Sequence, residues 1–147
     1  MEKTMEIQRI LIAVDSSEYS LNAAKHGLHL ATQLDANAAL LFVVDTSKAL
    51  GNVDAGLMPE EEIIVLKKEA EQTLDQLNEM YGSEYVDKLM AAGHPRESIL
   101  KMADAWEADI IVVGTHSRTG ISRLFVGSVS EYIVHHSKIP VMVVPSR

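Results

Sequence analysis

Short apolar runs alternate with longer amphipathic segments along almost the whole chain, and no other feature restricts its fold as strongly. The apolar runs cover residues 10–14, 38–44, 86–91, 109–113 and 140–144, of which 86–91 is the weakest and carries charge. Runs that are apolar on both faces are typical of strands in a parallel sheet that helices cover on each side. The pattern therefore predicts five parallel strands.

The amphipathic segments between these runs predict four helices. They cover residues 17–34, about 59–81, the segment that follows Pro95, and 128–136. An apolar stripe runs along the first of them through Leu21, Ala24, Leu28 and Ala31. Ser17 is the N-cap candidate of that helix, with Ser20 as the alternative. Strands and helices in strict alternation predict an α/β fold with right-handed crossovers.

Composition limits the class of protein and its partners. The chain has 147 residues, which suits one domain over 1–147, and its formal net charge is −8. Such a surface repels nucleic acid, so we expect none as a main partner. There are no cysteines, which excludes disulfides and thiolate chemistry. No apolar run approaches the roughly 20 residues that cross a bilayer, so we expect no membrane contact and a cytoplasmic protein.

Asp15 directly follows the first apolar run, where ligands bind in open parallel sheets. Its carboxylate could accept hydrogen bonds from a ribose or from the amino group of adenine. The alternative is that Asp15 only caps the first helix together with Ser16 and Ser17. Position alone does not separate the two interpretations.

The segment 114–128, between the fourth run and the last helix, is rich in glycine and serine and contains Arg118 and Arg123. Glycines let backbone N–H groups approach an anion, and a helix that begins after Gly127 adds further donors. We therefore expect phosphate binding here, with an ordinary polar connection as the alternative. The spacing matches neither a Walker A loop nor a dinucleotide fingerprint.

Other candidate residues are weaker. Val43, near the end of the second run, could contact a base or belong to the core. His116, inside the glycine-rich segment, could act as a general base or only shape the loop. His26 and His29 have the spacing of a metal pair, but no third ligand is evident.

Several of these pieces together resemble the universal stress protein family, from about Ile10 to Pro145. They are Asp15 after Ile-Leu-Ile-Ala-Val, the Val-Val-Asp45 end of the second run, Gly93-His-Pro95, Ala108-Asp-Ile-Ile-Val-Val-Gly114, Gly127-Ser-Val-Ser130 and Ile139-Pro-Val-Met-Val-Val144. The resemblance implies an open, doubly wound, five-stranded parallel sheet in the order 3-2-1-4-5 with four helices, Rossmann-like and of the adenine nucleotide alpha hydrolase type.

ATP-binding members of the family carry Gly, two residues, Gly, nine residues, then Gly and Ser or Thr. Gly114 and Gly127-Ser128 match that motif with intact spacing, but Ser117 replaces the middle glycine. A Cβ disfavours a left-handed backbone at that position, although a hydroxyl could itself bind phosphate. The replacement weakens the ATP assignment without removing it.

The resemblance implies a cofactor and a set of site residues. The cofactor is ATP, with Mg²⁺ as a further expectation. Asp15 would contact ribose, Val43 would lie beside adenine, and Ala13 stands where some members have proline. The remaining nucleoside and phosphate contacts would be Val113, Gly114, Ser117, Gly127, Ser128, Val129 and Ser130. It also implies a homodimer through antiparallel pairing of Val141–Val144, an edge strand that would otherwise be exposed.

Three functions remain open on this basis. The first is an ATP-binding regulatory, stress-response domain with at most weak hydrolysis, since no P-loop lysine or positioned base is evident. The second is a slow ATPase or nucleotide hydrolase that uses His116 and Mg²⁺. The third is an interaction dimer that binds no nucleotide, which the Ser117 replacement favours.

Overall fold

A computed structural model describes residues 6–46, 59–115 and 127–146. Five strands form one parallel sheet in the order β3-β2-β1-β4-β5. The strands are β1 (Arg9–Val14), β2 (Asn37–Asp45), β3 (Asp87–Gly93), β4 (Ile110–Gly114) and β5 (Val141–Val144). The helices are α1 (Tyr19–Leu34), α2 (Pro59–Tyr81), α3 (Pro95–Ala105) and α4 (Ser128–His136). The predicted fold class, strand order and helix number are confirmed for these residues.

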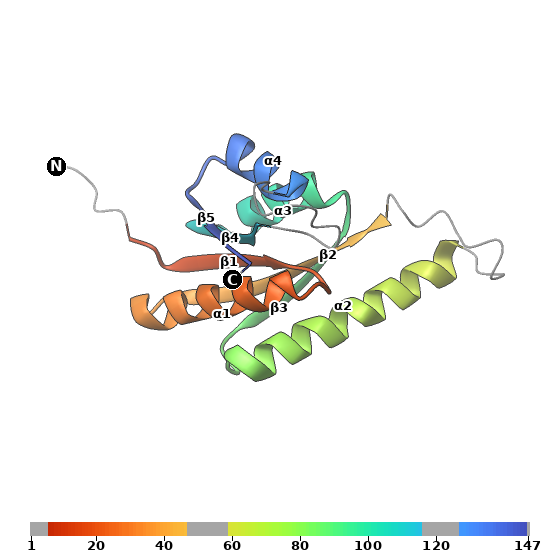
Figure 1. Cartoon of the computed structure of the whole chain (residues 1–147), viewed down its shortest axis with the longest axis horizontal. Helices are drawn as coiled ribbons and strands as arrows, with labels where there is room; N and C mark the ends of the chain where they lie inside the picture. The colour runs from red at the N-terminus through yellow and green to blue at the C-terminus, as the bar shows by residue number, and fades with distance from the viewer. Residues whose placement is uncertain (1–5, 47–58, 116–126, 147) are drawn as a thin grey trace.

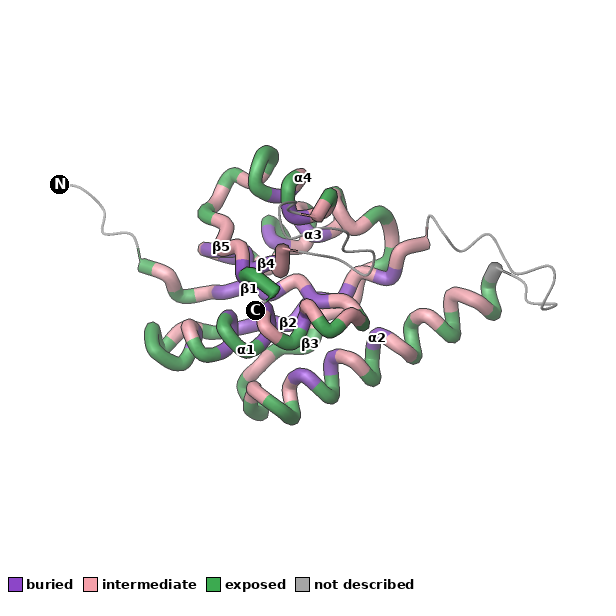
Figure 2. Tube along the Cα trace, viewed as in Figure 1, coloured by how far each residue is buried: buried purple, intermediate pink, exposed green. Residues whose placement is uncertain are grey.

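Helices α1 and α2 cover one face of the sheet, and α3 and α4 cover the other (Figure 1). Each face has its own buried cluster. Successive residues of β1 alternate between them: Ile10 and Ile12 pack toward α1 and α2, whereas Leu11 packs toward α3 and α4. The buried residues accordingly gather along the strands (Figure 2). This double burial explains why the central runs are apolar at every position.

The start of the first helix differs from the prediction. It begins at Tyr19 with Glu18 at the N-cap position, and no side chain caps it. Ser17 is not the N-cap because its backbone N–H and hydroxyl both donate to Asp15 Oδ1. The apolar stripe was also partly wrong, since Leu21 is 37% exposed. The residues of α1 that are buried against the sheet are Ser20, Ala23, Ala24, Gly27, Leu28 and Ala31.

No helix in the described part of the chain combines the length and the apolar character that a bilayer span requires.

Gly27 sets how closely α1 approaches the sheet. A Cβ at this position would lie 2.7 Å from both Cγ1 and Cδ1 of Ile12, and 3.4 Å from Cγ1 of Val112. Ile12 is fully buried, so its side chain has little room to move away. Glycine at this point therefore lets α1 settle directly over β1 and β4.

We predict that Gly27→Ala lowers the free energy of unfolding by about 1 kcal/mol net, because overpacking against Ile12 outweighs the gain in helix propensity. In an Ile12→Ala background, which removes both clashing atoms, the same change should be neutral or stabilising. Urea denaturation of the four proteins in this double-mutant cycle measures the coupling. Equal losses in both backgrounds would show that the Ile12 contact does not govern the packing of α1.

Candidate functional site

A cavity of about 510 Å³ lies at the carboxyl ends of β1, β2 and β4. The chain leaves β1 for β2 on one side and reaches β4 on the other, so the cavity is at the point where the strand order reverses. Ligands of open α/β sheets bind at such points. The first turns of α3 and α4 and the amino-terminal half of α2 complete the wall.

All the predicted site residues within the described segments line this one cavity. They are Ala13, Asp15, Val43, Val113, Gly114, Gly127, Ser128, Val129 and Ser130. They come from three strand ends and the start of α4, so residues up to 117 positions apart in sequence meet at one place. Ser117, His116, Arg118 and Arg123 lie outside the described residues.

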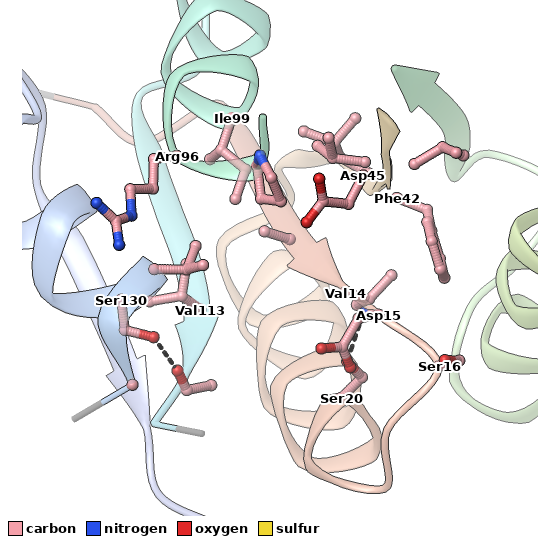
Figure 3. A pocket seen from close by; sticks show the side chains of 18 of the residues that line it. Val14, Asp15, Ser16, Ser20, Phe42, Asp45, Arg96, Ile99, Val113 and Ser130 are labelled. Atoms are coloured by element: carbon pink, nitrogen blue, oxygen red, sulfur yellow. Dashed lines mark hydrogen bonds between the residues drawn. The ribbon is translucent and has the colours of Figure 1, made fainter. Parts of the chain in front are cut away.

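Asp15 orders the turn that leads into α1 and also lines the cavity, but it does not cap the helix. Its Oδ1 accepts hydrogen bonds from the backbone N–H and the hydroxyl of Ser17 and from the hydroxyl of Ser20, the last at 2.9 Å. The backbone N–H of Asp15 donates to the same Ser20 hydroxyl over 2.6 Å (Figure 3). No described residue donates to Oδ2. One oxygen therefore fixes the carboxylate, and the other remains an acceptor for a ligand.

The start of α4 is tied to the end of β4. The backbone N–H of Gly127 donates to Thr115 O, and the hydroxyl of Ser130 donates to Gly114 O (Figure 3). Glu131 makes the first backbone bond of the helix, to Gly127 O at 2.9 Å. The N–H groups of Ser128, Val129 and Ser130 thus have no acceptor within α4. They form a positive helix end beside the cavity, as an anion requires.

The hydroxyl of Ser130 bonds within the protein and not toward the cavity. Its side chain is buried, and its hydroxyl proton is committed to Gly114 O. Its contribution to anion binding would come from its backbone N–H, while its side chain positions α4. The apolar wall on the same face of the sheet is made by Val43, Val113 and Ile99.

Sequence reasoning missed the residues that α2 and α3 add to the cavity. They are Glu62, Leu66, Glu69, His94, Pro95, Arg96 and Ile99. The sequence did contain a signal for the residues near the start of α3. The segment from His94 directly follows a strand, as Asp15 does, and such residues are candidates for a site. Gly93 makes the turn between β3 and α3, with φ +145°, and a Cβ there would lie 2.8 Å from Ser98 Oγ. The α2 group had no such signal, since it lies within a long helix.

The described residues of the cavity wall carry mostly negative charge. Asp15, Asp45, Glu62 and Glu69 line it, and Oε2 of Glu62 is buried without a hydrogen-bond partner. A buried acceptor of this kind favours a ligand with N–H or O–H donors. Across the described segments, no group of three or more histidine, aspartate or glutamate residues is arranged to hold a metal ion.

The chain is similar in sequence to known proteins over nearly its whole length. The family model described as "Universal stress protein family" matches residues 6–145. A universal stress protein of Methanocaldococcus jannaschii is 35% identical over 143 residues, which cover 93% of this chain and 81% of the relative. A universal stress protein of Bacillus subtilis is 31% identical over 147 residues, with 92% and 97% covered.

Solved structures share the fold. A universal stress protein from Lactobacillus plantarum superposes with a TM-score of 0.81 at 26% identity, over 96% of this chain and 99% of that one. A universal stress protein in complex with cAMP matches with a TM-score of 0.71 at 19% identity, over 97% and 100%. One from Archaeoglobus fulgidus in complex with dAMP matches with a TM-score of 0.63 at 20% identity, over 95% and 99%.

The match of the family model over nearly the whole chain, and the identity to relatives of similar length, lead to one conclusion: the chain belongs to the universal stress protein family.

Proposed function

We propose that this protein binds an adenine nucleotide, with ATP as the preferred ligand, in the cavity at the carboxyl ends of β1, β2 and β4. In this proposal it works as a cytoplasmic, nucleotide-responsive regulatory homodimer and not as a fast enzyme. The observation that carries the proposal is Asp15, whose Oδ1 is fixed by serine donors while Oδ2 accepts from no described residue. The vicinal hydroxyls of a ribose are suitable donors for that oxygen.

The rest of the wall supports the same ligand. An apolar slot beside Val43, Ile99 and Val113 suits the flat face of a base, and the N-terminus of α4 suits a phosphate. Two structures of this fold hold adenine nucleotides, cAMP in one and dAMP in the other. Mg²⁺ would arrive with the phosphates of ATP, as is usual for this ion. Slow hydrolysis through His116 stays a prediction, tested by whether His116→Ala reduces the formation of ADP.

The homodimer is proposed to form through β5, which is the last strand of the sheet. The carbonyl of Pro140 accepts a hydrogen bond from the backbone N–H of Ile111 in β4. The carbonyl of Val144 accepts one from the backbone N–H of Thr115, which follows β4, and both N···O distances are 3.0 Å. Alternate residues of a strand point their backbone N–H and C=O groups to opposite edges. Those of Val141 and Val143 therefore face the open edge of the sheet. A second copy in antiparallel orientation would pair with these groups and protect the edge.

We predict that Asp15→Asn weakens ATP binding about tenfold or more, because the charged acceptor for the ribose is lost while the serine donors keep an oxygen to bind. Titration calorimetry of nucleotide-stripped protein with Mg-ATP measures the change, with AMP and GTP as ligand controls. Asp75→Asn, on the exposed surface of α2, is the matched charge control. ATP affinity that is unchanged in Asp15→Asn would contradict the ribose assignment.

We predict that Val143→Pro converts the dimer to a monomer, because proline removes an outward-facing N–H without breaking a bond to β4. Val143→Thr keeps that N–H at similar side-chain volume and should remain dimeric. Size-exclusion chromatography with light scattering measures the mass, and thermal unfolding checks that both variants are folded. A proline variant that stays dimeric would place the interface elsewhere.

A further inference from the structure

Positive charge is scarce among the described residues that line the cavity. Of the described residues that line it, Arg96 alone carries a permanent positive charge, against the carboxylates of Asp15, Asp45, Glu62 and Glu69. His94 lines the cavity too, but its Nδ1 is 3.2 Å from the carboxylate of Glu97. A ligand with several phosphate charges would be repelled by this wall unless a cation offset the carboxylates.

Arg96 is placed to supply that cation. It is in the first turn of α3, and its half-buried side chain extends toward the first turn of α4 (Figure 3). The guanidinium carbon is 5.7 Å from the ring centre of Tyr132, which in turn stacks on His136 with centroids 4.0 Å apart. No described carboxylate or carbonyl accepts a hydrogen bond from the guanidinium. The aromatic stack thus limits where the group lies, and its N–H donors remain available.

The two sides of the cavity are therefore chemically different. Arg96 and Ser130 lie on one side, and Asp15 lies well away on the other (Figure 3). A guanidinium donates two parallel N–H groups, a geometry that matches phosphate oxygens. The open N–H groups of α4 serve the same side, so an anion there would be bound from two directions.

We propose that Arg96 determines the preference of the cavity for phosphorylated ligands over the bare nucleoside. This inference rests on the nucleotide site proposed above and goes beyond it. Phosphate selection is assigned to a residue of α3 that binds the phosphates together with α4.

The test compares ATP, AMP and adenosine binding to the full chain by titration calorimetry. Arg96→Gln should weaken ATP binding about tenfold or more and leave adenosine affinity nearly unchanged, because only the phosphate contact is lost. Arg96→Lys should recover part of the loss, since it keeps the charge without the planar fork. Lys101→Gln, an equal charge change at an exposed position of the same helix, is the control and should bind as the wild type does.

A second readout separates a phosphate contact from a structural role. ATP binding by Arg96→Gln should depend less steeply on salt than ATP binding by the wild-type protein, because one ionic contact is missing. Equal losses for adenosine and ATP, or unchanged ATP affinity, would overturn the inference and leave the proposed nucleotide site standing. Wild-type protein that binds neither adenosine nor ATP at millimolar concentration would overturn both.

Discussion

The candidate site depends on one constraint, the parallel packing of β1 between β2 and β4. β1 pairs with β2 from Arg9↔Asn37 to Val14↔Phe42 and with β4 from Ile10↔Ile110 to Ile12↔Val112. Because the strands are parallel, they end at the same edge, and each right-handed crossover begins there. The turns after β1, β2 and β4 therefore converge, although far apart in the sequence. The close approach of α1 at Gly27 and the double burial of β1 hold this edge in place.

This geometry explains what could be predicted from the sequence. Continuous apolar runs predict buried parallel strands, and residues that follow them, such as Asp15 and Gly114, are predicted to meet. The order of the strands came with the family resemblance, since alternation alone does not determine which strands are neighbours. The predicted start of α1 was wrong because Ser17 donates two hydrogen bonds to Asp15 Oδ1. N-cap preferences do not include such an interaction. Arg96 was not predicted because it follows residues 86–91, which are the weakest of the apolar runs and carry charge. The position of Glu62 and Glu69 in the cavity wall depends on how α2 packs against β2, and no local sequence pattern predicts that packing.

Of the two interpretations of Asp15, the helix cap was wrong, because Glu18 is at the N-cap position of α1 and no side chain caps the helix. The proposed ligand contact is compatible with the bonds from the serines, because a carboxylate has two oxygens and Ser17 and Ser20 use only one of them. The hydrogen bonds from Ser17 and Ser20 orient the carboxylate and so reduce the entropy that would be lost when a ligand orders it. Ser130 also has two roles. Its hydroxyl holds α4 against Gly114, and its backbone N–H has no acceptor within the helix. In both cases the residues that hold the fold together also shape the cavity.

The central claim is that the cavity at the strand ends binds ATP. Titration of isotopically labelled, nucleotide-stripped protein with ATP, followed through backbone amide NMR signals, tests both the binding and its place. The account predicts saturable shifts concentrated at Ala13–Asp15, Val43–Asp45 and Gly127–Ser130, with small changes at the opposite edge of the sheet around Arg9 and Asp109. The absence of shifts up to millimolar ATP, or shifts confined to that opposite edge, would contradict it.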